Sequence, residues 1–265
     1  MTADAPPAAL LDELVRLASD LAVVAGDTAR AGRRGATIGV STKSTSTDLV
    51  TIHDKAAELV VVDGITAARS ADAIIGEEGT DRTGTSGVTW YVDPIDGTTN
   101  FVYDLPLWST SIAAGDATGM LVGVVYAPVL GELFVAARGR GATLNGTPIR
   151  CSDRTDLALA LVGTGFAYRA ETRRVQAGVL HELIGSVRDI RRLGSAALDL
   201  CFAAAGRYDA YYETGLSPWD AAAGELIARE AGCRTGDFHG GPPVPGELLV
   251  STPAIFDAVT ALLDR

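Results

Sequence analysis

The stretch from residue 90 to residue 101 constrains the fold more than any other part of the chain; it reads Trp-Tyr-Val-Asp-Pro-Ile-Asp-Gly-Thr-Thr-Asn-Phe. Its apolar first residues predict a short strand that runs into two carboxylates, Asp93 and Asp96. Pro94 fixes the backbone after the first carboxylate, and Gly97 lets the chain turn after the second. The polar residues that follow predict the opening of a helix, so both carboxylates should lie where a strand meets a helix.

This junction predicts a site for an anion and a metal ion together. Unpaired backbone N–H groups at the start of a helix attract an anion, and phosphate is the usual one. Asp93 and Asp96 would repel a phosphate, so a cation must lie between these carboxylates and the anion. Oxygen ligands suit a hard divalent cation, and magnesium is the first choice.

Two further motifs accompany this stretch, and with it they span about residues 40 to 232. An Asp-Pro-x-Asp string alone would be weak evidence, since Asp-Pro often merely starts a turn. The further motifs are Gly76-Glu77-Glu78 and Trp219-Asp220-Ala221-Ala222-Ala223-Gly224. In this order and spacing, the three motifs resemble those of the inositol monophosphatases, a lithium-sensitive, magnesium-dependent phosphatase superfamily.

The resemblance implies a set of magnesium ligands. One ion is expected between Glu77, Asp93 and the carbonyl of Ile95. A second ion is expected between Asp93, Asp96 and Asp220, so that Asp93 bridges the pair. The resemblance also allows a third, weaker ion near Glu77. An Asp cap on the helix after Trp219 is compatible with metal binding by Asp220.

The resemblance also implies the residues that perform hydrolysis. Asp54 pairs with Thr98 to take a proton from the attacking water, and Glu77 is expected to be catalytic as well as a metal ligand. The backbone N–H groups of Gly97 and Thr98 are expected to hold phosphate oxygens. A purely structural alternative stays open for Asp54, because Thr51 and Asp54 have the spacing of a capping box.

Two residues are expected to lie around the metal ligands. Glu78 would orient Glu77 or a water at the metal. Lys43 lies in the Gly-, Ser- and Thr-rich segment 35–47, which surrounds a short predicted strand at Ile38–Val40. A surface hairpin without further role is one interpretation of this segment; the resemblance instead brings Lys43 towards the phosphate.

A second set of residues is expected to contact the alcohol half of the substrate. It consists of Gly194, Ser195, Ala196 and Glu213, together with the metal ligands Asp96 and Asp220. In the inositol phosphatases, the matching groups bind ring hydroxyls. The alternative for Glu213 is a solvated position at the edge of a sheet.

The expected function is magnesium-dependent hydrolysis of inositol monophosphate to inositol and phosphate. One alternative is another phosphatase of the superfamily, acting on histidinol phosphate, a nucleotide 3′-phosphate or fructose 1,6-bisphosphate. A different class of function is that of a binding partner in a macromolecular complex. The net charge of −11 argues against direct contact with nucleic acid or anionic membranes.

The remaining composition predicts a cytoplasmic protein. The chain shows no signal peptide and no long apolar segment. Its cysteines form no Cys-x-x-Cys pair, which predicts reduced thiols; they are Cys151, Cys201 and Cys233.

The resemblance implies an α/β (α+β) fold, a five-layer α/β/α/β/α sandwich of the inositol monophosphatase/fructose-1,6-bisphosphatase type, normally homodimeric. We expect two parts. Residues 1–150 form an α+β half with an antiparallel sheet and most metal ligands, and residues 151–265 form an α/β half with a mixed sheet, Asp220 and the substrate contacts.

Periodicity predicts the elements of each part. A first helix to about Arg33 should bury one face made of Leu10, Leu14, Leu17, Leu21 and Val24. A strand at 73–75, a loop at 79–88, a meander through 109–114, 121–127 and 132–137 and a turn at Asn145-Gly146 complete the first part. In the second part, strands at 159–164, 187–191, 208–212 and 248–251 alternate with helices at 171–185, 195–205, 219–231 and 253–264, which predicts a partly parallel sheet with helices on both sides.

Overall fold

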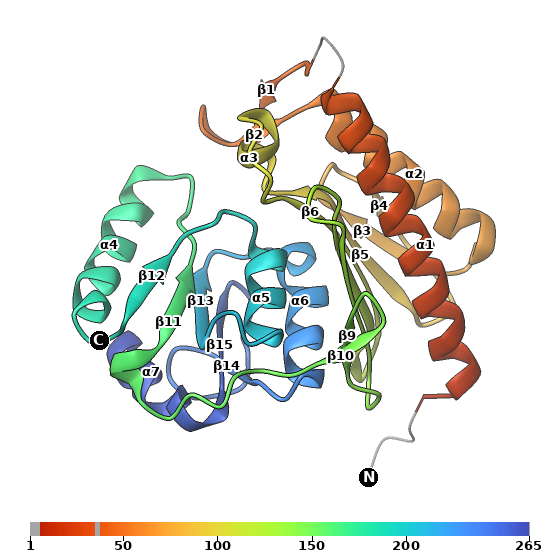
Figure 1. Ribbon diagram of the computed structural model, residues 1–265. Helices are drawn as coiled ribbons and strands as arrows, with labels where there is room; N and C mark the ends of the chain where they lie inside the picture. Colours follow the sequence, from red (N-terminus) through yellow and green to blue (C-terminus); the bar gives the residue numbers. More distant parts are fainter. Residues whose placement is uncertain (1–5, 35–37, 265) are drawn as a thin grey trace.

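The computed structural model describes residues 6–34 and 38–264, which stack in five layers of helices and sheets (Figure 1). The helices are α1 (Ala8–Arg33), α2 (Ile52–Ala68), α3 (Thr98–Val102), α4 (Ala170–Ile184), α5 (Ala196–Ala204), α6 (Pro218–Glu230) and α7 (Phe256–Leu263), with 3-10 turns η1 (Leu157–Leu159) and η2 (Pro253–Ile255). Helices α1 and α2 cover one face of the larger sheet, and α5 and α6 lie between the two sheets. Helices α4 and α7 cover the outer face of the smaller sheet, which confirms the predicted α/β/α/β/α sandwich.

The larger sheet has eight strands in the order β10-β9-β8-β7-β6-β5-β3-β4. They are β3 (Ala73–Gly76), β4 (Asp81–Arg82), β5 (Thr89–Asp96), β6 (Ser109–Asp116), β7 (Gly119–Ala127), β8 (Glu132–Ala137), β9 (Ala142–Leu144) and β10 (Thr147–Ile149). All neighbours pair antiparallel except β3 and β5. The predicted meander and the turn at Asn145-Gly146 are therefore confirmed.

The smaller sheet has five strands in the order β12-β11-β13-β15-β14. They are β11 (Leu161–Thr164), β12 (Asp189–Arg191), β13 (Ala210–Thr214), β14 (Arg234–Gly236) and β15 (Glu247–Ser251). Strand β11 runs parallel to β12 and β13, whereas β15 runs antiparallel to both of its neighbours. The predicted partly parallel sheet is confirmed, although β14 had no strong sequence signal because it is only three residues long.

Three apolar cores hold the five layers together. The first lies between α1, α2 and the larger sheet and includes Trp90 and Ile65. The second lies between the two sheets, around α5 and α6, and includes Leu200 and Leu226. The third lies under α4 and α7 and includes Phe256. None of the helices in the described ranges combines the length and apolarity needed to cross a membrane.

The first helix forms where predicted, but the face that it buries differs from the predicted face. Val24 is 52% exposed, and the second half of the buried face consists of small residues such as Ala22, Ala25 and Gly26. A Cβ on Gly26 would lie 2.8 Å from the ring of Tyr126 on β7, so the helix lies very close to the sheet. Small residues permit this approach, and a pattern search that follows large apolar residues misses it.

Two other local predictions were wrong. Residues 38–40 are not a strand; the short strand is β1 (Ser41–Thr42), which pairs antiparallel with β2 (Leu49–Val50), and residues 35–37 of the predicted segment lie outside the described residues. The predicted loop at 79–88 contains the two-residue strand β4, which pairs with β3. Both strands are too short to carry a periodic signal, because alternation needs several residues.

Helix α6 packs closely against the larger sheet on one side and against α5 on the other, and a glycine removes side-chain bulk at each contact. A Cβ on Gly123 of β7 would lie 2.7 Å from the carbonyl oxygen of Ala223 on α6. A Cβ on Gly224 of α6 would lie 2.6 Å from the Cβ of Leu200 on α5. The position of α6, and therefore of Asp220 in its first turn, depends on these two contacts.

We predict that Gly123→Ala lowers the free energy of unfolding by about 1–3 kcal/mol, because the added methyl group overpacks the contact with α6. The matched control is Gly178→Ala on α4, where a Cβ meets nothing within 4 Å. This control should raise the free energy of unfolding by about 0.4–1 kcal/mol. Urea denaturation measures both; equal effects of the two substitutions would contradict the close approach of α6.

Candidate active site

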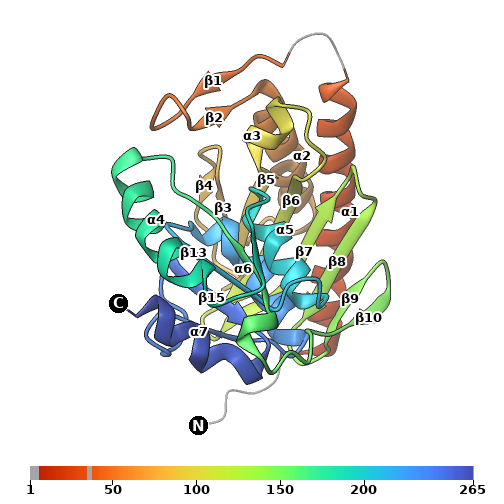
Figure 2. The same ribbon diagram turned by 60° about the vertical axis from the view of Figure 1, so that its left-hand side comes forward.

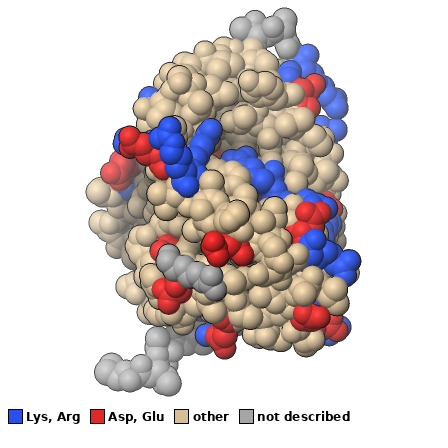
Figure 3. All heavy atoms as spheres, turned by 90° about the vertical axis from the view of Figure 1, so that its left-hand side faces the viewer, with Lys and Arg blue, Asp and Glu red and all other residues tan. Residues whose placement is uncertain are grey.

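A cavity of about 380 Å³ lies where the ends of β5, α5 and α6 meet. Most of the residues singled out in the sequence line it: Lys43, Glu77, Asp93, Ile95, Asp96, Gly97, Thr98, Gly194, Ala196, Glu213 and Asp220. The space-filling view shows a hollowed face, with Lys and Arg side chains gathered beside the hollow (Figure 3). In a molecule of net charge −11, these cations favour an anionic ligand at this point.

A β-bulge brings Asp93 and Asp96 to the same cavity. Asp93 pairs with Ser111 and Asp96 with Ser109, so two residues of β5 lie between them and only one residue of β6. Side chains three apart in a regular strand point to opposite faces. The extra residue in β5 removes this alternation, and both carboxylates line the cavity.

The turn after Asp96 requires a glycine. Gly97 has a φ of 94°, and a Cβ there would lie 3.0 Å from the carbonyl oxygen of Gly194. The five-residue helix α3 begins at the next residue, Thr98, as the sequence predicted. The first backbone N–H groups of this helix therefore lie beside both carboxylates.

Asp93 lies at the centre of an acidic group. It is 2% exposed, and its Oδ1 accepts a hydrogen bond of 3.1 Å from the backbone N–H of Ile95. Burial raises the pKa of Asp93 well above its usual range, and the charges of Glu77, Asp96 and Asp220 raise it further. Four acidic side chains from β5, α6 and the end of β3 are thus close enough to repel one another.

Asp96 is held by the start of α5. Its Oδ2 accepts hydrogen bonds from the Ser195 hydroxyl at 2.6 Å and from the Ala197 N–H at 2.8 Å. Its Oδ1 accepts one from the Ala196 N–H at 3.2 Å. Burial raises the pKa of Asp96 to about 6, although these hydrogen bonds act to lower it. Ser195 itself is 1% exposed and lies behind Asp96 rather than on the cavity wall.

Asp220 occupies the third position of α6, where its Oδ2 accepts a hydrogen bond of 2.7 Å from the backbone N–H of Ser217. The N-cap of α6 is therefore Ser217 and not Asp220, which instead completes a capping box from within the first turn. Asp220 also lines the cavity, so its cap does not remove it from the acidic group. Burial and the charge of Asp96 raise the pKa of Asp220 well above its usual range.

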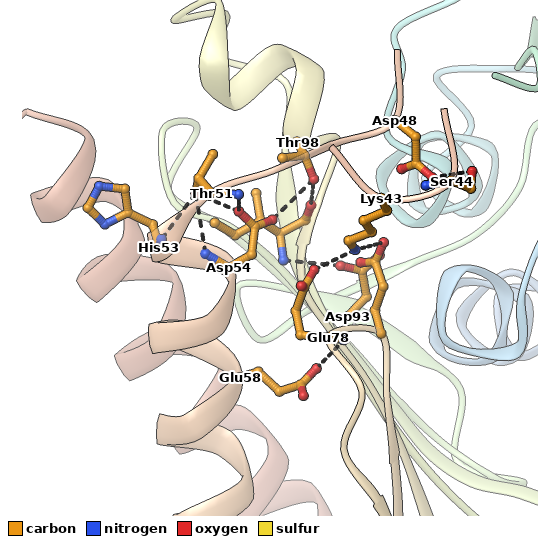
Figure 4. A network of polar contacts seen from close by, with 12 residues as sticks. Lys43, Ser44, Asp48, Thr51, His53, Asp54, Glu58, Glu78, Asp93 and Thr98 are labelled. Carbon is orange, nitrogen blue, oxygen red and sulfur yellow. Dashed lines mark hydrogen bonds and ion pairs between the residues drawn. The ribbon is translucent and has the colours of Figure 1, made fainter. Parts of the chain in front are cut away.

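Lys43 is the counter-ion of the acidic group (Figure 4). Its Nζ lies 2.9 Å from Glu77 Oε1 and 2.5 Å from Glu78 Oε1. Burial acts to lower the pKa of Lys43, but the two glutamates raise it above its usual value. Burial raises the pKa of Glu78 to about 7, against the opposing effect of Lys43. The segment 38–50 therefore places Lys43 beside the carboxylates. It is not a surface hairpin without further role, which was the other interpretation of this segment.

A hydrogen bond also joins this segment to the other side of the cavity. The Thr47 hydroxyl donates to the Tyr168 carbonyl oxygen at 3.2 Å, just before α4. The turned view shows β1 and β2 above the end of α4 (Figure 2). Tyr168 and Asp48 both line the cavity, and neither stood out in the sequence because each lies in a loop without a motif.

Glu58 of α2 fixes the turn that carries Glu77 and Glu78. It is 4% exposed, and its Oε2 accepts a hydrogen bond of 2.7 Å from the Glu78 N–H. Its Oε1 accepts a bond of 2.6 Å from the Thr80 hydroxyl. Glu58 was not predicted as a site residue, although it follows Asp54 by four positions and so lies on the same face of α2.

The two oxygens of Asp54 have different partners. Oδ2 accepts hydrogen bonds from the N–H and hydroxyl of Thr51, at 2.8 Å and 2.5 Å, and completes the predicted capping box. Oδ1 lies 3.2 Å from the hydroxyl oxygen of Thr98, which is also 3.1 Å from the Ile95 carbonyl oxygen. Burial raises the pKa of Asp54. Asp54 does not line the cavity itself, but its hydrogen-bond partner Thr98 does.

Glu213 lies on the opposite wall, at the end of β13. The Tyr211 hydroxyl donates a short hydrogen bond to its Oε2, and Glu213 lines the cavity. Burial raises the pKa of Glu213 to about 7. The solvated sheet edge considered for this residue is therefore wrong. Arg192 lines the same cavity and was not predicted, although its position directly before the Leu193-Gly194 turn is a usable signal.

The donor chemistry of the site fits a hard divalent cation. Glu77, Asp93, Asp96 and Asp220 offer only oxygen, and the charge of Lys43 cannot balance all four. Among the described residues, however, no group of three or more His, Cys, Asp or Glu side chains has the arrangement of a finished metal site. Asp96, Asp220 and Glu77 each direct an oxygen to a protein donor.

Known proteins resemble the chain over almost its whole length. An inositol-1-monophosphatase of Mycobacterium leprae is 44% identical over 237 residues, 85% of this chain and 81% of that protein. The Nus factor SuhB of Escherichia coli strain K12 is 44% identical over 220 residues, 82% of each chain. The crystal structure of the extragenic suppressor protein suhB of Bartonella henselae superposes with a TM-score of 0.91 at 32% identity, and covers 96% of this chain and 99% of that one. The inositol monophosphatase family matches residues 10–262, and the chain belongs to this family.

Proposed function

We propose that this protein is a magnesium-dependent phosphomonoesterase and that inositol monophosphate is its substrate. The observation that carries the proposal is the group of four carboxylates in one cavity beside the start of α3. Membership of the inositol monophosphatase family and the 44% identity to a protein named inositol-1-monophosphatase support the same reaction.

The magnesium ligands in this proposal are Glu77, Asp93, the Ile95 carbonyl, Asp96 and Asp220. Bound magnesium supplies Lewis-acid chemistry: it makes water a stronger acid and neutralises charge on the phosphate and the leaving oxygen. The protein contributes the crowding of its carboxylates, whose raised pKa values reflect a need for positive charge. Lys43 supplies part of this charge, and its contact with Glu77 must loosen when Glu77 turns to a metal.

Thr98 and Asp54 form the proton relay of the proposal. The Thr98 hydroxyl can donate its proton to Asp54 Oδ1 while its oxygen accepts a proton from water in the cavity. The raised pKa of Asp54 suits a base, because a carboxylate of higher pKa holds a proton more readily. The hydrogen bonds from Thr51 keep Asp54 in place during the transfer.

The start of α3 and the wall formed by β13 would hold the two halves of the substrate. The backbone N–H groups of Gly97 and Thr98 suit phosphate oxygens. Glu213 Oε1 suits an alcohol hydroxyl, since its other oxygen is occupied by Tyr211. Ser195 and Ala196 contribute by holding Asp96, and the contact of Gly194 with the substrate stays a prediction.

A second candidate role is that of a binding partner in a macromolecular complex. It rests on the relatives named Nus factor SuhB, which are 44% identical to this chain. The two roles separate in one assay: a panel of inositol 1-phosphate, fructose 1,6-bisphosphate, a nucleotide 3′-phosphate and histidinol phosphate with magnesium. Turnover of inositol 1-phosphate above the others supports the proposal, and no turnover of any ester by folded protein would overturn it.

We predict that Asp93→Asn lowers kcat/KM for inositol 1-phosphate by two to three orders of magnitude, about the loss caused by removing one preorganised electrostatic group. Asp93 is buried at the centre of the four carboxylates that would hold the metal, so its loss should weaken the whole site. The control is Asp63→Asn on the exposed side of α2, which should leave kcat/KM unchanged. Normal turnover by correctly folded Asp93→Asn protein would contradict the metal assignment.

We also predict that magnesium raises the Tm. At about 100 times its dissociation constant, a ligand bound only by the folded state should raise the Tm of a domain of this size by about 5–10 °C. Asp220→Asn should raise the Tm without magnesium, because repulsion falls while the asparagine can still accept the bond from Ser217. The same substitution should reduce the magnesium shift; an unchanged shift would remove Asp220 from the ligand set.

Finally, Glu213→Gln tests the alcohol. If Glu213 accepts a hydrogen bond from an inositol hydroxyl, this substitution should lower kcat/KM for inositol 1-phosphate roughly ten- to a hundredfold. Glutamine can still accept from Tyr211, so the local structure should persist. Hydrolysis of p-nitrophenyl phosphate, which has no hydroxyl to donate, should change little. Equal losses on both substrates would assign Glu213 to the scaffold instead.

A further inference from the structure

Two cysteines far apart in sequence lie together outside the cavity. Cys151 begins the connection from the larger to the smaller sheet, and Cys233 follows the end of α6. The Cys151 N–H donates to the Ala231 carbonyl oxygen at 2.9 Å. A Cβ on Gly232 would lie 3.8 Å from Cys151 Sγ, so the turn that carries Cys233 lies against the Cys151 side chain.

The two thiols differ in exposure. Cys151 is partly exposed and lines a shallow surface cavity with Arg150, Gly206 and Gly232. Cys233 is 7% exposed, and its Sγ lies 3.8 Å from the Ala203 carbonyl oxygen. Solvent therefore reaches the pair from the side of Cys151. Cys201, in contrast, is fully buried in α5.

The chemistry of the two thiols follows from these surroundings. The neighbouring Cys233 thiol lowers the pKa of Cys151 to about 7, although partial burial opposes this effect, and Thr252 and the charge of Arg150 add to it. The described residues that line this cavity include two charged ones, Arg150 and Asp153, so Arg150 is the only positive charge among them. The neighbouring Cys151 thiol and burial both raise the pKa of Cys233. The thiolate therefore forms on Cys151, where a solute can reach it.

We propose that Cys151 and Cys233 are a redox pair, in which Cys151 reacts with a hydroperoxide and Cys233 then closes a disulfide between the sheet connection and the end of α6. The inference does not depend on the phosphatase proposal, because neither cysteine lines the active-site cavity.

The two steps balance with one hydroperoxide. The Cys151 thiolate attacks one peroxide oxygen, a sulfur–oxygen bond forms, the oxygen–oxygen bond breaks, and an alcohol or water leaves after taking a proton. The Cys233 sulfur then attacks the sulfenic sulfur; a sulfur–sulfur bond forms, the sulfur–oxygen bond breaks, and water leaves with the Cys233 proton. Two thiols are oxidised to one disulfide, and the hydroperoxide is reduced.

The location gives the disulfide a structural effect. It would close a loop from residue 151 to residue 233, which contains both α5 and α6. A cross-link over so long a loop restricts the unfolded chain strongly. The oxidised protein should therefore have a Tm higher by about 5–10 °C.

The test treats the full-length protein with hydrogen peroxide, blocks the remaining thiols and maps its peptides without reduction. We expect a Cys151–Cys233 cross-link within one chain, a mass loss of two hydrogens, a raised Tm and reversal by dithiothreitol. In untreated protein at pH 7, iodoacetamide should label Cys151 at least about tenfold faster than Cys201 or Cys233.

Single substitutions assign the two roles. Cys233→Ser should leave a sulfenic acid on Cys151 that a 1,3-diketone traps, and Cys151→Ser should leave none on Cys233. Cys201→Ala is the matched control and should still form the cross-link. The proposal is overturned if wild-type protein retains all its thiols under peroxide, if the cross-link includes Cys201 or joins two chains, or if Cys151 labels no faster than the others.

Discussion

Mutual repulsion of buried carboxylates is the constraint on which the arrangement of this protein depends. Glu77, Asp93, Asp96 and Asp220 come from three different elements, yet they share one cavity. Each one has a protein donor: a lysine, the backbone N–H of Ile95, the start of α5 or the residue before α6. The ends of strands and helices meet at this cavity. Their unpaired N–H groups donate hydrogen bonds to the carboxylates and so replace the water that burial removes.

The same donors connect the site to the layers of the fold. Asp96 accepts from the first residues of α5, and Asp220 accepts from the residue before α6. These two helices fill the space between the sheets and pack against each other through Gly224. The site and the central core thus share their helices, so that any change in the packing of α5 on α6 also moves two of the four acids.

Much of this architecture could be predicted from the sequence. The three motifs identified the family, and through it the five layers, which the structure confirms. The capping box of Thr51 and Asp54 could be recognised because both partners lie within one turn. Glu58 and Tyr168 could not be placed in the same way, because their partners lie in other elements. The buried face of α1 was misjudged for a related reason: Gly26 leaves room for Tyr126 of β7, a contact that no local pattern contains.

The position of Asp220 in the chain has a consequence for synthesis. The larger sheet takes its strands from residues 73–149, so a growing chain can complete it well before α6 leaves the ribosome. The acidic group, in contrast, needs Glu77, Asp93, Asp96 and Asp220 together. A nascent chain therefore carries its earlier carboxylates without their last neighbour, and the full charge density of the cavity arises only when most of the protein has been translated. Because Asp220 comes late in the chain, the strongest repulsion among the carboxylates arises only after the strands of the larger sheet have been translated.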